Sequence, residues 1–368
     1  MRVSLSLALD ELFYSSLKKY VTEGHALVKE LYINLGDLKT VRILSYYPGT
    51  EGIISRELKW SLTSPVQNPD ATIYLWNETG FEDLFKRLTG VSLELNPSDK
   101  GWLEFQRHGN GGQLYPIATI DLSGEWGMHY TSGNEFFYGV DGLAPESWFK
   151  EGHLFVQALF RILNQPTTSL VHGACVGVDG KGILVCARGG MGKSTLSVMA
   201  MLRGFEYVSD DYLILSDANQ SLEASPIYSF ITLSPKMYDS MYDDLDRARF
   251  LGVSPWRGKY VLDISGYEDR FRSHYPVKAL VFPEITPGLS EPHIAKCSAA
   301  EKGKAIVQIA HSTISQMSLS GLRGTQRDVD FIQKIIKSLG KLDCFKIALS
   351  PDLEANVACL ESFIKTIV

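Results

Sequence analysis

The sequence predicts a mixed α/β (α+β) protein in two parts, a smaller β-rich region over residues 1–140 and a larger α/β domain over residues 141–368. The chain of 368 residues is long enough for two domains, and its 45% apolar and 21% charged residues are ordinary for a globular protein. Segments with the two-residue period of strands alternate with segments of helical period. Over residues 182–202 a Gly-rich turn separates an apolar strand candidate from a helix candidate.

The N-terminal region combines strand-forming segments with two short helix candidates. A turn-prone run over residues 108–112, His-Gly-Asn-Gly-Gly, is expected to separate two of the strands. No repeat, charge block or catalytic signature occurs there, so its expected role is substrate capture or assembly. The expected elements are helices over 12–20 and 81–88 and strands over 71–76, 103–106 and 115–122.

The second region is expected to begin with a helix followed by a hairpin. Pro145 and Glu146 suit a first helical turn, because proline is tolerated there and an acid favours the helix dipole. Apolar positions continue this helix to residue 163. Two strands over 169–186 then meet at the turn Asp179-Gly-Lys-Gly182, which is typical of a hairpin.

Helices and strands alternate from the Gly-rich turn to the C-terminus. Arg203-Gly204 is expected to end the helix that follows the turn, because glycine readily adopts the left-handed stop conformation. The other expected elements are mostly helix over 234–250, strands over 205–215 (interrupted by two acids), 222–224, 260–264, 277–282 and 345–348, and helices over 325–339 and 353–367.

The Gly-rich segment over 185–195, Val-Cys-Ala-Arg-Gly-Gly-Met-Gly-Lys-Ser-Thr, has the pattern of a phosphate-binding loop. Glycines let the backbone N–H groups approach phosphate oxygens, and the following helix adds its N-terminal dipole. Ala187 stands where the first glycine is usual, and it is the smallest substitute. The residues expected to bind a nucleotide are Gly189, Gly190, Met191, Gly192, Lys193, Ser194 and Thr195.

Two adjacent acids, Asp210 and Asp211, lie at the end of the strand after the loop helix. One carboxylate can hold Mg²⁺ or its water, and the other can accept a proton from an attacking hydroxyl. A solvated turn is the alternative for an Asp pair. The position after a phosphate loop, at a strand end, favours the functional interpretation.

Four segments in this order resemble the HPr kinase/phosphorylase family and its wider kinase-like relatives. They are His172-Gly, the loop Gly190-Met-Gly-Lys-Ser194 after Gly182-Ile-Leu-Val, Arg203-Gly, and Val208-Ser-Asp-Asp211. The resemblance covers about residues 140–368. It implies the phosphoenolpyruvate-carboxykinase-like version of the phosphate-loop fold, with strands partly antiparallel around the loop.

The resemblance also implies a role for each matching residue. Asp210 would be the base that deprotonates an acceptor hydroxyl, and Asp211 and Ser194 would hold Mg²⁺. Lys193 would stabilise charge that develops on the γ-phosphate. His172 would contact the phosphates or the Asp pair, or would alternatively pack in the core.

The chain departs from the family after the Asp pair. The family's second signature, Glu-x-Arg-Gly-x-Gly, is reduced here to Trp256-Arg-Gly-Lys259. Neither a phosphorylase reaction nor HPr as substrate is therefore predicted, and the chain looks closer to divergent relatives encoded with peptide-modification or surface-polysaccharide functions. Arg257 and Lys259 would share one face of an extended strand, where they either clamp a phosphate or form an exposed basic turn.

Composition excludes several classes of protein. The formal net charge of −6 provides no basic field for nucleic acid, and no apolar run is long enough to span a membrane. Asp10 and Glu11 interrupt the short apolar N-terminal stretch, which argues against a signal peptide. Five cysteines without a CxxC pair indicate the cytoplasm, and eight scattered histidines give no zinc spacing.

The sequence therefore predicts a kinase that uses ATP and Mg²⁺ and transfers the γ-phosphoryl group to a hydroxyl acceptor, namely a serine of a protein or peptide or a small-molecule alcohol. Two alternatives stay open. One is a nucleotide-binding interaction module with little or no catalysis. The other is a carboxykinase, for which the chain is short and has no Arg-rich anion site. The identity of the acceptor, the choice of nucleotide and assembly into a homo-oligomer are left open.

Overall fold

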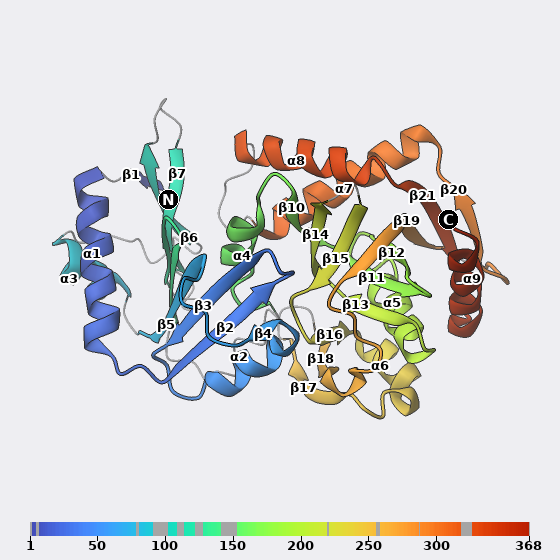
Figure 1. Cartoon of the computed structure of the whole chain (residues 1–368), viewed down its shortest axis with the longest axis horizontal. Coiled ribbons are helices and arrows are strands. Elements are labelled where there is room, and N and C mark those ends of the chain that lie inside the picture. The colour runs from blue at the N-terminus through green and yellow to red at the C-terminus, as the bar shows by residue number, and fades with distance from the viewer. Residues whose placement is uncertain are drawn as a thin grey trace.

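The computed structural model of the chain shows a mixed α+β fold with three mixed or antiparallel sheets in its described part (Figure 1). This agrees with the predicted fold class at that level. No helix of the described residues is long and apolar enough to cross a membrane. The described residues are 2–4, 7–78, 81–90, 102–108, 114–121, 128–140, 153–218, 221–254, 258–286, 288–317 and 326–367.

The first sheet lies in the N-terminal part and has the order β1-β6-β7-β8-β9-β5-β3-β2-β4. Strand β5 lies in the interior of this sheet, parallel to both of its neighbours, β3 and β9. The strands are β1 (Arg2–Ser4), β2 (Lys29–Leu35), β3 (Lys39–Ser45), β4 (Leu62–Thr63), β5 (Ala71–Asn77), β6 (Trp102–His108), β7 (Leu114–Asp121), β8 (Met128–Ser132) and β9 (Glu135–Val140).

Both faces of the first sheet are covered, which explains why β5 is buried along most of its length. Alternate side chains of a strand point to opposite faces. Tyr74 and Trp76 accordingly pack with helices α1 (Leu7–Gly24) and α3 (Phe81–Thr89), which lie at the outer edge of the molecule in Figure 1. Ile73 and Leu75 face the other way, into a core that includes α2 (Glu51–Glu57) and α4 (Val156–Leu163).

The second sheet has the order β10-β14-β15-β19-β12-β11-β13, with β21 beside β19 and β20 beside β21. Strand β12, which leads into the Gly-rich loop, lies between parallel β19 and antiparallel β11. The strands are β10 (Thr168–His172), β11 (Ala174–Val178), β12 (Lys181–Val185), β13 (Glu206–Ser209), β14 (Tyr212–Ala218), β15 (Ser221–Pro226), β19 (Tyr275–Ile285), β20 (His293–Lys296) and β21 (Asp343–Leu349).

Helices cover both faces of this second sheet. Apolar residues of α5 (Lys193–Leu202) and α9 (Leu353–Thr366) pack with one face, and those of α7 (Ala299–Met317) and α8 (Gln326–Leu339) pack with the other. A third, antiparallel sheet has the order β16-β18-β17 and adjoins α6. The strands are β16 (Phe230–Leu233), β17 (Arg249–Val253) and β18 (Tyr260–Asp263), and the helix is α6 (Pro235–Met241).

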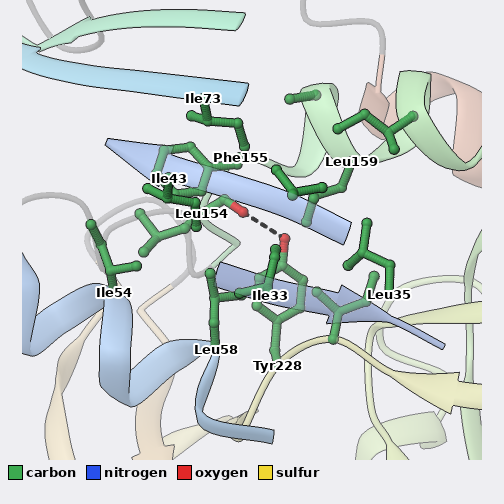
Figure 2. Close-up of a cluster of buried hydrophobic side chains, with 14 of the residues drawn as sticks. Ile33, Leu35, Ile43, Ile54, Leu58, Ile73, Leu154, Phe155, Leu159 and Tyr228 are labelled. Atoms are coloured by element: carbon green, nitrogen blue, oxygen red, sulfur yellow. Dashed lines mark hydrogen bonds between the residues drawn. The ribbon is translucent and has the colours of Figure 1, made fainter. Parts of the chain in front are cut away.

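One hydrophobic core joins the first sheet to the second part of the chain. Ile33, Ile43 and Ile73 of the first sheet share a buried cluster with Phe155 and Tyr228 (Figure 2). The cluster also contains residues of α4, β10 and β14. The hydroxyl of Tyr228 donates a hydrogen bond of 2.8 Å to the backbone carbonyl of Leu154, drawn as a dashed line in Figure 2.

The end of α2 and the 3-10 turn that follows it form hydrogen bonds with the segment that leads into β16. The backbone N–H of Ser229 donates to the carbonyl oxygen of Glu57 at 2.9 Å. The Ser61 hydroxyl donates to the carbonyl oxygen of Ile227, also at 2.9 Å. The N-terminal part therefore helps to position β16, the strand that carries Thr232 into the site described below.

Some sequence-based expectations about elements differ from the structure. Of residues 234–250, the helical part ends earlier than expected: α6 ends at Met241, a 3-10 helix follows over Tyr242–Asp244, and Phe250 lies on β17. Pairing of β17 with β18 and packing of Phe250 against the Tyr260 ring outweigh the local helical pattern. The segment 169–186 forms three strands instead of two, because β10 pairs with β14 whereas β11 pairs with β12.

The helix expected to run to residue 163 begins only at Val156 within the described residues, because Phe155 has a φ of +60°. The remaining expected elements that fall in described residues are present, some with longer bounds. The expected helix at 12–20 extends over α1, and the acid pair does separate β13 from β14. Most of the turn at 108–112 and the helix start at 144 lie outside the described residues. The elements not predicted are β1, β2, β3, β4, β8, β9, β16, β17, β20, α2 and α7.

Candidate functional site

The Gly-rich loop connects the buried end of β12 to the first turn of α5. Gly190 and Gly192 have φ values of +83° and +90°, which glycine adopts without the steric cost of a Cβ. Gly192 is the N-terminal cap residue of α5, and Leu196 donates its N–H to the Gly192 carbonyl at 2.9 Å. Gly189 and Gly190 are exposed, and no atom lies within 4 Å of a Cβ built on either. The loop thus presents an accessible helix N-terminus, a geometry suited to an anion.

Gly192 is expected to tolerate substitution less well than Gly189. A Cβ on Gly192 would approach the Leu349 Cδ1 to 2.7 Å and would require alanine to hold a positive φ. Gly192→Ala should therefore lower the free energy of unfolding by about 1–2 kcal/mol, the usual cost of left-handed backbone in an L-residue. Gly189→Ala is the matched control and should leave it nearly unchanged. Equal losses in urea unfolding would contradict the strained geometry of Gly192.

Lys193 begins α5 and points its ammonium group at both acids of the strand end. Its Nζ lies 2.6 Å from Oδ1 of Asp210 and 2.8 Å from Oδ1 of Asp211. All three side chains are nearly inaccessible, with exposed fractions of 7% for Lys193, 0% for Asp210 and 7% for Asp211. Burial alone would lower the pKa of Lys193, but the charges and hydrogen bonds of the two acids raise it above its ordinary value.

Asp211 occupies an unusual backbone conformation and a cationic environment. Its φ is +69°, and the reversal there separates β13 from β14. Burial alone would raise the pKa of Asp211, but the charge of Lys193 holds it well below its usual range. Smaller contributions in the same direction come from His172, His153 and Lys259.

Thr232 and His153 contact the second carboxylate oxygen of Asp211. The Thr232 hydroxyl donates to Oδ2 at 3.3 Å, and Nε2 of His153 lies 3.8 Å from the same oxygen. The His153 ring packs edge-on against Tyr212 and Tyr228. Together with Lys193, these two residues hold Asp211 from three separate segments of the chain.

Asp210 keeps one carboxylate oxygen without a hydrogen bond. Its Oδ1 accepts from Lys193, whereas its buried Oδ2 has no hydrogen-bond partner within the described part of the chain. Buried carboxylate oxygens are rarely left unsatisfied unless a ligand, a metal or a proton completes them. The free Asp210 oxygen can therefore accept a proton from a ligand, while a neighbouring carboxylate can bind Mg²⁺, which usually binds one or two carboxylates together with substrate phosphates.

The structure places His172 beside the acids, at the end of β10. Its ring is edge-on to Tyr212 at 5.2 Å, and its backbone N–H donates to the Thr313 hydroxyl of α7 at 3.1 Å. It is also among the groups that lower the pKa of Asp211. His172 is thus both buried and close to the Asp pair, and its role in the site stays a prediction.

Lys259 lies near the acids, whereas Arg257 lies outside the described residues. The Lys259 ammonium group is 3.5 Å from the Thr232 hydroxyl that contacts Asp211. The Lys259 carbonyl accepts a hydrogen bond of 2.7 Å from the Ser254 N–H. Whether Arg257 and Lys259 share one face stays a prediction.

Arg203 connects the end of α5 to two acids of neighbouring elements. It ends α5, as predicted, and Gly204 follows it with a φ of +100°. Its guanidinium group pairs with Glu354 of α9 and with Asp244, at 2.7 Å and 3.0 Å, and these partners raise its pKa. The Arg-Gly helix stop thus ties α5 to neighbouring elements.

His153 and Thr232 are the site residues that the sequence patterns missed. His153 lies in the chain segment just before α4, outside any motif, and Thr232 lies in an apolar strand. Neither is close in sequence to Asp211. Only the folded chain brings them together, so no local pattern could have identified them.

Comparison with known proteins gives little independent information. No family model and no curated protein matches the chain. Among solved structures, the HPr(Ser) kinase/phosphatase from Coxiella burnetii is a weak structural neighbour. It has 14% sequence identity and a TM-score of 0.30, with 54% of this chain and 88% of that chain covered. Similarity at this level does not establish a shared fold.

Proposed function

We propose that the protein is a phosphotransferase that binds a nucleoside triphosphate, with ATP as the expected donor, at the loop 189–195. The observation that carries the proposal is the ion cluster of Lys193, Asp210 and Asp211 beside an open, Gly-rich helix N-terminus. Phosphoryl transfer requires donors for phosphate oxygens, a cation for developing charge and an acid-base group. The loop N–H groups, the Lys193 ammonium group and the two carboxylates supply these three functions where β12 meets α5.

In this proposal the loop backbone and Lys193 contact the phosphates, and Asp210 accepts the proton of the attacking hydroxyl. Ser194 and Asp211 would hold Mg²⁺, which when bound neutralises charge on the phosphates. Lys193 must leave at least one of its carboxylate partners to reach a phosphate. Thr232 and His153 would then retain Asp211 in place through its Oδ2. His172 and Lys259 would add positive charge at the same end of the site, and Met191 and Thr195 would line the loop.

The proposed architecture is the phosphoenolpyruvate-carboxykinase-like form of the phosphate-loop fold. Support comes from β12, which is flanked by one parallel and one antiparallel strand instead of two parallel ones. The acceptor is proposed to be a hydroxyl group of a protein, a peptide or a small alcohol. Arg257 and Lys259 are proposed to bind an acceptor or a phosphate at the edge of the site.

The base assignment is tested by replacing Asp210. Asp210→Asn should retain ATP binding and lower the rate of γ-phosphoryl transfer by about 10²–10⁴-fold, the usual contribution of a general base. Transfer of labelled phosphate from ATP to a panel of serine peptides and polyols provides the measurement. The control is Asp217→Asn. Asp217 lies on β14, the strand that directly follows Asp211, and it pairs with Lys341.

Two outcomes would change the proposal in different ways. Full transfer by Asp210→Asn to a verified acceptor would show that Asp210 is not the base. Tight binding of Mg-ATP by the wild-type chain without transfer to any acceptor would favour a nucleotide-binding module, in which the nucleotide sets conformation.

A further inference from the structure

Two cysteines face each other across the antiparallel strands β20 and β21. Strands β20 and β21 are antiparallel, and Lys296 pairs with Phe345 in their register. Cys297, the next residue after β20, is therefore opposite Cys344. The Cys297 N–H donates to the Cys344 carbonyl at 2.8 Å, which confirms this pairing.

The geometry of such a pair is compatible with a disulfide. Directly opposite residues of a hydrogen-bonded antiparallel pair have Cα atoms about 5.5 Å apart. Disulfides usually join Cα atoms about 4.4–6.8 Å apart. Burial raises the pKa of the Cys344 thiol, and the neighbouring Cys297 thiol raises it further. Cys297 lies between the end of β20 and the start of α7, and its N–H is held by the Cys344 carbonyl.

The two thiols differ in access to solvent, which gives them different roles in oxidation. Cys297 is partly exposed, whereas Cys344 is buried in the apolar cluster beneath α7 and α8. Lys302 interacts electrostatically with Cys344, and Lys346 does so with Cys297. Reactive cysteines are typically partly accessible and near cationic groups.

The other three cysteines do not combine partial exposure with a cysteine on the neighbouring strand. Cys175 and Cys186 are completely buried in the same cluster, and burial raises the pKa of both. Cys359 of α9 is partly exposed, like Cys297, but it lies on a helix and takes no part in the pairing of β20 with β21. It therefore serves as a matched reference thiol.

We propose that Cys297 and Cys344 form a redox modification site that hydroperoxides convert to an intramolecular disulfide. The Cys297 sulfur attacks the peroxide, whose O–O bond breaks, to give a sulfenic acid and one molecule of water (or alcohol). The Cys344 sulfur then displaces the hydroxyl group of the sulfenic acid, which leaves as a second molecule of water with the thiol proton. The cysteines are oxidised by two electrons, and the peroxide is reduced. This site does not depend on the proposed phosphotransferase function.

Oxidation would tie the start of α7 to the strand that follows α8. Residues 298–343, which contain both helices, would then form a closed loop. Closing a loop restricts the unfolded chain and so favours the folded state. The expected physical effect is greater resistance of α7 and α8 to unfolding, reversed by a thiol reductant.

The test treats the reduced full-length chain with hydrogen peroxide and counts free thiols in denaturant. The count should fall from five to three, with the mass of the intact chain lower by two hydrogen atoms. Peptide mapping should find Cys297 joined to Cys344. Cys297→Ser should abolish the disulfide, whereas the matched variant Cys359→Ser should leave its formation unchanged.

Mapping of the wild-type chain keeps the proposal falsifiable even if a variant at the buried Cys344 fails to fold. Conversion of Cys297 to sulfinic acid without a disulfide would overturn it. A disulfide to Cys175, Cys186 or Cys359, or loss of the Cys359 thiol as fast as that of Cys297, would do the same. Recovery of all five thiols after dithiothreitol is expected from the disulfide and not from overoxidation.

Discussion

Replacing Lys193 by methionine is expected to lower the free energy of unfolding by about 3–5 kcal/mol at neutral pH, as when one partner of a buried ion pair is removed. Lys193 neutralises two carboxylates at 2.6 Å and 2.8 Å in a nearly inaccessible site. Without it, Asp210 and Asp211 would remain buried with less compensating charge. Urea unfolding monitored by circular dichroism measures the effect.

The effect of Lys193→Met should depend on pH in a defined way. Because the pKa of Asp211 is depressed in the folded chain, its contribution to stability is present above its ordinary value of 3.8 and is lost as pH falls. Because the pKa of Lys193 is raised, its contribution is present below its ordinary value of 10.5 and is lost at higher pH. The difference between wild type and variant should therefore be greatest between these two values.

A surface pair provides the control for Lys193. Lys341 contacts Asp217 at 2.6 Å, but the lysine side chain is 49% exposed. Lys341→Met should change the free energy of unfolding by about 0–1 kcal/mol, as is usual for exposed ion pairs. Losses of the same size in both variants, or no pH dependence for Lys193→Met, would contradict the buried ion cluster.

Replacing Glu57 by glutamine is expected to stabilise the chain at alkaline pH. Glu57 is 1% exposed, at the end of α2, and neither carboxyl oxygen has a hydrogen bond of ordinary geometry to a described residue. Burial raises its pKa from 4.5 to about 8, against smaller lowering effects of the Leu154 backbone and the Arg56 charge. The folded chain therefore keeps this carboxyl group protonated at neutral pH.

The sign of the Glu57 effect follows from proton linkage. Between pH 4.5 and about 8 the unfolded chain releases the proton and the folded chain retains it, so stability falls as pH rises. One pKa unit corresponds to about 1.4 kcal/mol, so the full cost above pH 8 is about 5 kcal/mol. Glu57→Gln should remove this cost, and a gain of about 2–5 kcal/mol at pH 8 is expected in urea unfolding.

The control for Glu57 is an exposed acid on α1. Glu23→Gln removes a side chain that is 68% exposed and should change stability by less than about 0.5 kcal/mol. The gain for Glu57→Gln should be much smaller at pH 4 than at pH 8. A constant gain across this range, or a loss at pH 8, would show that Glu57 is not protonated in the folded chain.

The loop and the acid pair of the candidate site could be predicted from the sequence because they lie close together along the chain. The loop, the helix and the strand end with its two acids follow one another within residues 182–211. Glycine spacing and strand-to-helix order carry enough information to place Lys193 near the acids. The same reasoning gave β5, β12, α3, α8 and α9 with nearly correct bounds.

The surroundings of the acids could not be predicted because they come from segments distant in sequence. His153 and Thr232 reach Asp211 only after the N-terminal sheet, α4 and β16 pack into one core. The helix α7 was missed although Ser298 and Glu301 form a reciprocal cap at its start, with hydrogen bonds of 2.8 Å and 3.3 Å between side chain and backbone. The Ser-x-x-Glu pattern of this cap is visible in the sequence and could have indicated the start of the helix.

The central claim, that the loop and ion cluster form a nucleotide site, is tested most directly by calorimetric titration of the full chain with Mg-ATP. We predict saturable binding of one ATP per chain that weakens at least about tenfold in Gly189→Ala, because a Cβ would obstruct close approach of phosphates to the backbone. This substitution leaves the free chain unstrained, so the comparison does not depend on folding. Absence of binding at millimolar ATP, or equal affinity in the folded variant, would contradict the account.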